Sequence, residues 1–156
     1  MIVEDRVIIE DPTLASQLHA KGYGEFINKR LELSLVEAAY LAEKKKIPYD
    51  FKEIVKHAVK IQPRFWVRYH VYRDMRERGY IVKTALKYGA DFRVYERTMK
   101  EHAKWILFAV REGDLLSWYN FAAMMRVAHS VRKKLLIGVV DEEGDVTYYE
   151  VRWLRP

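Results

Sequence analysis

The sequence predicts an α/β (α+β) protein: a small N-terminal α/β domain, residues 1–62, followed by a C-terminal domain, residues 63–156, with a mixed sheet flanked by helices. Two observations lead to this prediction. Helix-start signals dominate the first half, whereas the region after Gly79 holds several strand-like runs with one helix among them. Such an alternation favours a sheet covered by helices. We place the boundary near Gln62-Pro63, where the composition becomes basic.

A strand and a helix start the N-terminal domain. The β-branched run Val7-Ile8-Ile9 predicts the strand. Asp11-Pro12 follows as an N-cap with proline at the first helical position, and the helix should run to about Ala20. Two glycines then break the helix, and the alternating residues 25–33 predict a strand or an extended link.

Two more helices of this domain carry start signals. Ser34, with Glu37 three residues later, has the pattern of a capping box. We expect this helix to end at the Lys44-Lys45-Lys46 run, because cations are favourable at a helix C-terminus. Asp50 begins the next helix in the same way, and that helix should reach about Ile61.

A long helix from Arg64 to Arg78 is predicted to follow, with Gly79 as its left-handed cap. Its apolar side chains recur every three or four residues and so share one face. This face comprises Phe65, Val67 or Arg68, Tyr69, Tyr72 and Met75.

The rest of the chain reads as strands with one helix between them. The expected elements are strands at 80–84, 91–95, 105–110, 135–140 and 146–154, turns at 87–89 and 141–145, and a helix at 118–130 capped by Ser117. In the second strand Phe92 and Val94 should point inward, with Arg93 and Tyr95 on the opposite face. The run 105–110 is almost wholly apolar, as is typical of a central strand buried on both faces.

The composition is that of an ordinary globular protein. The chain has 156 residues, of which 50% are hydrophobic, so a sizeable core can form. There is no cysteine, which excludes disulfides and thiolate metal sites. We see neither a signal-peptide pattern at the start nor a run of roughly 18 apolar residues. We therefore expect a cytoplasmic protein that does not enter a membrane.

The net charge of +6 is unevenly distributed. Residues 1–50 contain 7 Lys and Arg against 9 Asp and Glu, and residues 51–156 contain 21 against 13. A basic half favours a polyanionic partner, with nucleic acid as the first candidate. The alternative is the Lys- and Glu-rich surface that is typical of heat-stable proteins.

Common catalytic motifs are absent from the chain, including Gly-rich phosphate loops, zinc-binding His-Glu-x-x-His and the nucleophile elbow. A metal-dependent nuclease would need grouped carboxylates with a lysine. The nearest candidates are Asp91, Glu96 and Glu101 with Lys104, and their spacing is poor.

A metal-free set of acid and base groups is also present. Tyr95, His102 and Lys133 could take a proton, give a proton and stabilise negative charge when RNA is cleaved by its own 2′-hydroxyl. A tyrosine, whose pKa is about 10, acts as a base only if nearby cations lower that pKa, and Lys87, Lys133 and Lys134 are candidates. Each residue also has an ordinary structural interpretation: a sheet aromatic, a turn histidine and a helix-end lysine.

Longer blocks of the sequence resemble the archaeal tRNA-splicing endonuclease family. In the second half these blocks are Gly79–Thr84, Lys87–Arg97, Arg126–Lys134 and Val140–Tyr149, and in the first half Asp5–Pro12, Gly22–Gly24 and Leu33–Ala38. The resemblance covers nearly the whole chain and is weakest at 42–64 and 98–121.

This resemblance implies a C-terminal nuclease domain whose active residues are a tyrosine, a histidine and a lysine, which correspond to Tyr95, His102 and Lys133. It implies cleavage of precursor tRNA at bulge-helix-bulge junctions without metal or another cofactor, leaving 2′,3′-cyclic phosphate and 5′-hydroxyl ends. Arg126 resembles a position that stacks on a bulged base, which suits a guanidinium. With Lys87 and Lys134 it makes up the predicted substrate-binding set.

The family works as dimers or tetramers, so the resemblance implies either a homo-oligomer or a heterotetramer with a structural subunit. The acidic turn is similar to a loop that docks onto a neighbouring subunit. Its candidate contact residues are Asp141, Glu142, Glu143 and Asp145. The rival hypothesis is a non-catalytic RNA-binding or assembly subunit of such a complex.

Overall fold

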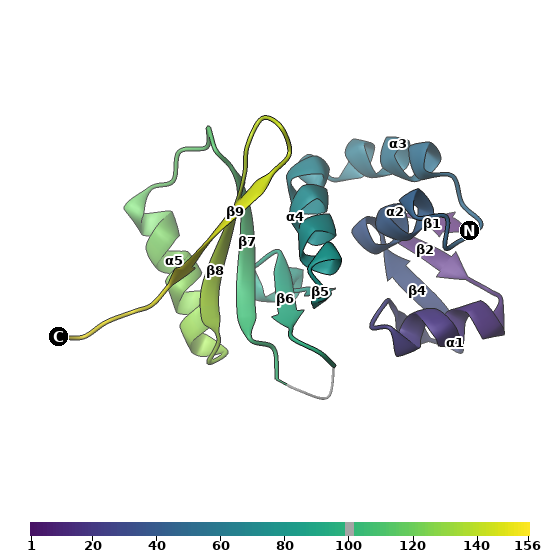
Figure 1. Cartoon of the computed structure of the whole chain (residues 1–156), viewed down its shortest axis with the longest axis horizontal. Coiled ribbons are helices and arrows are strands. Elements are labelled where there is room, and N and C mark those ends of the chain that lie inside the picture. The colour runs from purple at the N-terminus through teal and green to yellow at the C-terminus, as the bar shows by residue number, and fades with distance from the viewer. Residues whose placement is uncertain (99–101) are drawn as a thin grey trace. The chain divides into compact units, whose positions relative to one another are not determined.

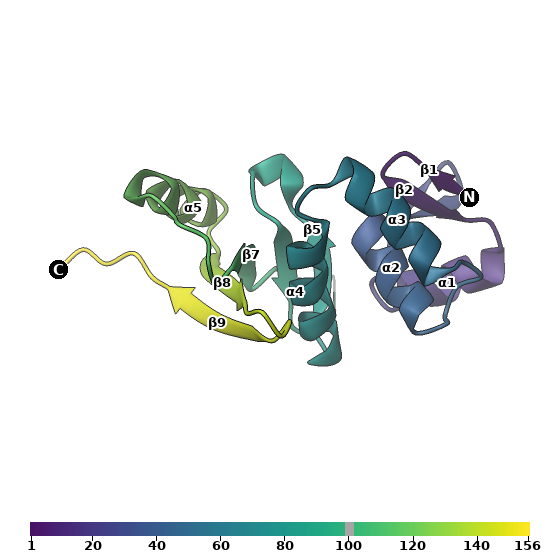
Figure 2. The same ribbon diagram turned by 90° about the horizontal axis from the view of Figure 1, so that it is seen from above.

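The computed structural model describes residues 1–98 and 102–156, which fold into two compact units, Met1–Tyr72 and Arg73–Pro156 (Figures 1 and 2). Each unit has its own sheet, and the predicted mixture of helices and strands is confirmed. Helix α4, Phe65–Glu77, passes through the division, and the domain boundary at residues 62 and 63 stays a prediction. No helix in the described ranges is long and apolar enough to cross a membrane.

The first unit contains an antiparallel sheet of four strands in the order β1-β2-β4-β3. The strands are β1 (Ile2–Val3), β2 (Arg6–Ile9), β3 (Glu25–Ile27) and β4 (Arg30–Ser34), and the helices are α1 (Pro12–Ala20), α2 (Leu35–Glu43) and α3 (Phe51–Ile61). The inward side chains of β2 and β4, among them Val7, Leu31 and Leu33, are fully buried.

All three predicted helix starts of this unit are confirmed. The side chain of Asp11 accepts a hydrogen bond from the backbone N–H of Thr13, and that of Asp50 accepts one at the start of α3. Ser34 and Glu37 form the complete capping box. These caps satisfy backbone donors that a helix leaves without partners, which explains why short sequence signals located them.

The segment 25–33 differs from the single strand or link that its alternation predicted. It folds into a hairpin, in which β3 pairs with β4 around Asn28 and Lys29. Both residues have left-handed backbone conformations, with φ of 51° and 67°. Such a pair is the requirement of a type I′ turn, and the sequence lacks the glycine that usually signals it.

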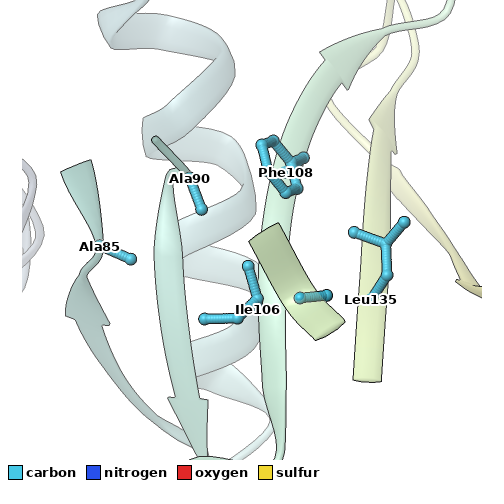
Figure 3. Packing of buried hydrophobic residues seen from close by; sticks show 6 residues of the cluster. Ala85, Ala90, Ile106, Phe108 and Leu135 are labelled. Carbon is cyan, nitrogen blue, oxygen red and sulfur yellow. The ribbon is translucent and has the colours of Figure 1, made fainter. Parts of the chain in front are cut away.

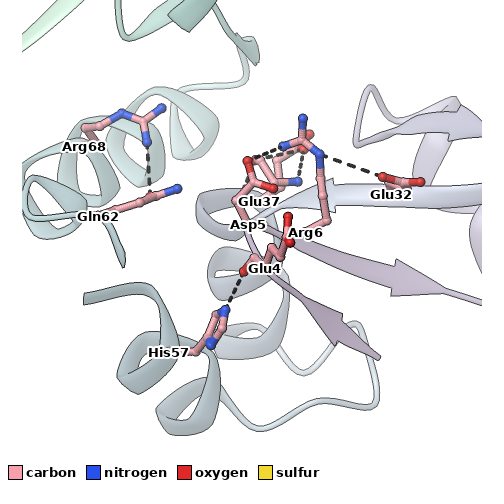
Figure 4. A network of polar contacts seen from close by, with 9 residues as sticks. Glu4, Asp5, Arg6, Glu32, Glu37, His57, Gln62 and Arg68 are labelled. Carbon is pink, nitrogen blue, oxygen red and sulfur yellow. Dashed lines mark hydrogen bonds and ion pairs between the residues drawn. The ribbon is translucent and has the colours of Figure 1, made fainter. Parts of the chain in front are cut away.

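Polar contacts secure the edges of this unit (Figure 4). Arg6 lies between Asp5 and Glu32, at N–O distances of 3.8 and 3.9 Å. The ring of His57 in α3 contacts the backbone oxygen of Glu4. Glu37 is buried, and its carboxylate accepts hydrogen bonds from the backbone N–H of Gly24 (2.8 Å) as well as from Ser34. One side chain therefore joins α2 to the segment before β3.

The second unit contains a mixed sheet of five strands in the order β5-β6-β7-β8-β9. The strands are β5 (Ile81–Thr84), β6 (Phe92–Tyr95), β7 (Trp105–Arg111), β8 (Lys134–Val140) and β9 (Val146–Val151), with the short 3₁₀ helix η1 (Leu86–Tyr88) and helix α5 (Trp118–Ser130). Strands β7 and β8 are parallel, and every other neighbouring pair is antiparallel. The predicted central strand is confirmed as β7.

Helix α5 covers one face of this sheet and forms the core with it. Ile106 and Phe108 of β7 and Leu135 of β8 project from the sheet, together with the alanines that flank η1 (Figure 3). Ala128 of α5 packs against them, and Met124 and Met125 complete the contact. Because α5 is the crossover between β7 and β8, this packing closes a βαβ unit.

The last turns of α4 lie against the opposite face. The hydroxyl of Tyr148 in β9 donates a hydrogen bond of 2.7 Å to the carboxylate of Asp74, which also forms an ion pair of 2.8 Å with Arg78. Burial, and then the hydrogen bond to Asp74, raise the pKa of Tyr148 far above its usual range.

We predict that Tyr148→Phe lowers the free energy of unfolding by about 2 kcal/mol, because a hydrogen bond to a charged group is lost. Since the folded chain keeps the Tyr148 proton longer than the unfolded chain, this group's contribution is complete below the pKa of unfolded tyrosine and is lost as pH rises above it. The loss of stability at alkaline pH should therefore be less steep in the variant. Urea unfolding at several pH values measures both effects.

Tyr149→Phe is the matched control, because Tyr149 is the next residue of β9 and its side chain is exposed. Equal unfolding free energies for the two variants would contradict the prediction.

Candidate active site

The topology of the second unit brings three chain segments to one end of its sheet. Strand β6 is antiparallel to β7, and β7 is parallel to β8. The C-terminal end of β6 therefore lies at the same end of the sheet as the N-terminal ends of β7 and β8. Tyr95 is the last residue of β6, His102 precedes β7, and Lys133 immediately precedes β8.

The backbone of Lys104 ties these three segments together. Its N–H donates a hydrogen bond of 2.7 Å to the carbonyl of Val94, the residue before Tyr95. Its carbonyl accepts a hydrogen bond of 3.4 Å from the N–H of Lys134, the residue after Lys133. His102 lies only two residues from this junction, so the strand pairing itself holds the three predicted catalytic residues close together.

The conformation at the end of α5 places Lys133. Val131 is the C-cap, and Arg132 has a left-handed backbone with φ of 57°. The N–H of Lys133 donates to the carbonyl of Ala128 (2.9 Å), and the N–H of Arg132 donates to that of His129 (3.1 Å). This is the hydrogen-bond pattern of a Schellman motif, here with arginine at the left-handed position that glycine usually takes.

A pocket of about 260 Å³ opens where the three segments meet. Its lining comprises Tyr88, Arg93, Tyr95, His102, Ala103, Ile106, Val131 and Lys133. All three predicted catalytic residues are therefore brought together. Tyr95 is only 7% exposed, Lys133 is half-buried and His102 is exposed.

The charges around this pocket favour an anion. Arg93 and Lys133 supply cations, and His102 can add a third positive charge when it is protonated. Among the described residues, no carboxylate lines the pocket. The arrangement combines groups that can exchange protons with groups that can stabilise negative charge, which acid-base cleavage of a phosphodiester needs.

The predicted substrate-binding residues lie outside this lining. Lys87 in η1 extends over the ring of Tyr88, 5.4 Å from its centroid, so it is one residue from the pocket wall. Lys134 forms a 3.9 Å ion pair with Glu150. Arg126 is exposed on α5. Their contact with substrate stays a prediction.

Several lining residues were not predicted as site residues, and Arg93 is the most important chemically. Strand alternation had already placed it on the same face as Tyr95. Tyr88, Ile106 and Val131 gave no sequence signal as site residues, because only the fold brings η1, β7 and the end of α5 to one place.

The alternative metal site is not assembled in the described part of the chain, where no group of three His, Asp or Glu side chains could hold a metal ion. Asp91 is buried and accepts a hydrogen bond of 2.8 Å from the N–H of Ala109. Glu96 forms an ion pair with Lys104, at 2.7 Å. Glu101 lies outside the described residues.

The two residues of the Glu96–Lys104 ion pair lie on either side of His102 in the sequence. The hydrogen bond from Lys104, and then its charge, lower the pKa of Glu96. The ammonium of Lys104 also lies 4.5 Å from the ring centroid of Trp105, whose indole N–H donates a 2.8 Å hydrogen bond to Glu150. These side chains connect the end of β6 to the start of β7 and to β9.

In the acidic turn between β8 and β9, one side chain forms hydrogen bonds within the turn and three others are exposed. The carboxylate of Asp141 accepts hydrogen bonds from the N–H groups of Glu143 (2.9 Å) and Asp145 (3.0 Å), so this side chain holds the turn in shape. Glu142, Glu143 and Asp145 are exposed. A contact with another subunit would therefore use these three residues.

Comparisons with known proteins match both parts of the chain to one family. Residues 1–55 match the family model of the tRNA intron endonuclease N-terminal domain, and residues 65–148 match that of the tRNA intron endonuclease catalytic C-terminal domain. The chain is 48% identical to a tRNA-splicing endonuclease of Pyrococcus furiosus, over 97% of this chain and 93% of the relative. It is 40% identical to the one of Methanothermobacter thermautotrophicus, over 98% and 95%. The pocket lies within the segment that matches the catalytic domain.

We predict that Lys104→Met raises the pKa of Glu96 toward that of an ordinary glutamate, because the variant removes the hydrogen bond and the charge that lower it. In the wild type, the lowered pKa contributes stability that is complete above the pKa of unfolded glutamate and is lost as pH falls through the folded value. Carboxyl ¹³C NMR titration of Glu96 measures the change.

Lys134→Met serves as the control, since Lys134 pairs with Glu150 rather than with Glu96. If Glu96 titrates alike in the wild type and in Lys104→Met, the ion pair does not exist in solution.

Proposed function

The chain belongs to the tRNA intron endonuclease family, and from this premise we propose that it excises introns from precursor tRNA in the cytoplasm by metal-independent cleavage at bulge-helix-bulge junctions. One observation carries the proposal: Tyr95, His102 and Lys133 line one pocket, although they come from three segments of the chain. Those residue types supply a base, an acid and a cation without a metal ion.

The proposed reaction is a transesterification within the RNA. The 2′-oxygen at the cleavage site forms a bond to phosphorus while the bond from phosphorus to the 5′-oxygen breaks. Tyr95 accepts the proton of the 2′-hydroxyl and His102 donates one to the departing 5′-oxygen, so the products are a 2′,3′-cyclic phosphate and a 5′-hydroxyl. Lys133 stabilises the charge that develops on the phosphate oxygens.

The burial of the three side chains is consistent with these roles. Tyr95 is mostly enclosed, which suits a group that acts on the attacking oxygen inside the pocket. His102, which precedes β7, is exposed and can exchange protons with water between reaction cycles. Lys133 is held at its backbone by the Schellman motif, which limits the positions of its ammonium.

We also propose that surrounding cations bind the RNA outside the reacting linkage. Arg126 would stack on a bulged base, and Lys87 and Lys134 would contact phosphates. These side chains are exposed and lie on segments next to pocket residues, so a single RNA strand could reach them together with the pocket.

The active form is proposed to be an oligomer, either of identical chains or with a structural subunit. The exposed acids of the turn between β8 and β9, Glu142, Glu143 and Asp145, are suited to a basic surface on a neighbour. Large apolar side chains are also exposed around the start of α5, including Leu115 (99%), Trp118 (84%) and Tyr119 (77%). An apolar segment of this kind is typical of a surface that becomes covered in an assembly.

We predict that the purified chain cleaves a bulge-helix-bulge RNA in EDTA at the same rate as in Mg²⁺, because protein groups alone move the protons. Gel electrophoresis and end-group analysis should show 2′,3′-cyclic phosphate and 5′-hydroxyl ends. Cleavage that requires added metal would overturn the mechanism. Cleavage only after a second archaeal subunit is added would show that this chain acts in a heteromeric enzyme.

We predict that His102→Ala and Lys133→Ala each lower the single-turnover cleavage rate by about 10²- to 10⁴-fold, as expected for loss of a general acid or of a transition-state cation. Arg126→Ala should have a smaller effect, a decrease of about 10-fold that comes mainly from weaker RNA binding.

Lys52→Ala, on the exposed side of α3, is the matched control and should retain the wild-type rate. If His102→Ala and Lys133→Ala also retained it in the assembled enzyme, this chain would be a non-catalytic RNA-binding or assembly subunit.

A further inference from the structure

Arg93 occupies the same face of the sheet as Tyr95. The two residues are separated by one position in β6, and side chains at such positions point to the same side of a strand. The register pairs Arg93 with Ile106 of β7, and both line the pocket with Tyr95. The guanidinium carbon of Arg93 lies 6.0 Å from the centroid of the Tyr95 ring.

Among the residues that the structure describes, the contacts of Arg93 orient its guanidinium and add no negative charge to it. Its Nε donates a hydrogen bond of 3.2 Å to the backbone carbonyl of Thr84, which holds one edge of the planar group. A carbonyl carries no net charge, and the other contact is with the Tyr95 ring. The remaining Nη groups keep donors for a further partner, because a guanidinium has five N–H groups in all.

The proposed reaction needs more positive charge than Lys133 supplies. A phosphodiester carries one negative charge, and the five-coordinate species formed by 2′-oxygen attack carries a second before the leaving oxygen is protonated. A guanidinium presents parallel N–H donors that match two oxygens of one phosphate, which a lysine ammonium cannot do in the same fixed geometry.

On the basis of the function proposed above, we propose that Arg93 is a second phosphate-binding cation of this pocket. It donates hydrogen bonds to a nonbridging oxygen of the scissile phosphate, acts together with Lys133, and strengthens its contact as charge builds up. Half-burial and the Thr84 hydrogen bond make it a preorganised donor, so it contributes more to the transition state than to initial RNA binding.

The first test compares Arg93→Gln and Arg93→Lys with the wild type in single-turnover cleavage of a bulge-helix-bulge RNA. Arg93→Gln should lower the rate by about 10²- to 10³-fold, and Arg93→Lys, which keeps the charge but loses the planar fork, by less. Arg111→Gln is the control, since Arg111 is exposed at the other end of β7 and should leave the rate unchanged. A wild-type rate in Arg93→Gln would overturn the proposal.

A second measurement separates phosphate contact from a merely structural role. A sulfur atom placed at the contacted nonbridging oxygen should slow the wild type, because sulfur is a poor hydrogen-bond acceptor. In Arg93→Gln that penalty should shrink for one of the two phosphorothioate stereoisomers. If the penalties of both isomers are the same in the wild type and the variant, Arg93 does not contact the phosphate.

An RNA with a 2′-deoxy nucleotide at the cleavage site distinguishes failure of this proposal from failure of the proposed function. It cannot be cleaved, so the difference in its affinity between the wild type and Arg93→Gln reports the contribution of Arg93 to binding without the reaction. Weaker binding by Arg93→Gln, with no cleavage of ordinary RNA by the wild type, would retain the phosphate site and refute the reaction. Equal binding, with normal cleavage by both proteins, would refute the role of Arg93 and retain the reaction.

Discussion

The parallel pairing of β7 with β8 is the interaction on which the site depends. It places the N-terminal ends of both strands side by side. Because β6 is antiparallel to β7, its C-terminal end lies at the same end of the sheet. Lys104 marks the junction, because its two backbone groups bond to β6 and to the start of β8. A shift of one residue in either register would move Tyr95 or Lys133 to the wrong face of the sheet.

Packing on both faces keeps this register in place. On one side α5 closes the crossover and buries Ile106 and Leu135, so a slip would remove apolar side chains from the core. On the other side Trp105 and Tyr148 use their polar atoms to bind Glu150 and Asp74. The pocket therefore lies at the end of a sheet that is packed on both faces, with these two hydrogen bonds added on the face opposite α5.

The pocket and the acidic turn, residues 141–145, lie at opposite ends of β8 and carry opposite charge. The cations Arg93 and Lys133 line the pocket, whereas two carboxylates close to Arg93 in the described part of the chain, Asp91 and Glu96, are engaged by Ala109 and Lys104. The end of the sheet that holds the proposed site therefore presents positive charge, which suits a polyanion such as RNA. The exposed acids between β8 and β9 lie on a different surface. This is consistent with one surface for substrate binding and another for assembly.

Local sequence was enough to predict the helix caps, the central strand β7 and the alternation that puts Arg93 beside Tyr95, because these depend on neighbours within a few residues. The resemblance in the blocks around Tyr95 and Lys133 added a chemical role for each. The hairpin at Asn28 and Lys29 escaped prediction, since its left-handed residues lack a glycine signal. The common pocket could not be inferred from periodicity either. Residues 95, 102 and 133 become neighbours only when β7 and β8 pair in parallel, and such pairing depends on long-range contacts that no local pattern encodes.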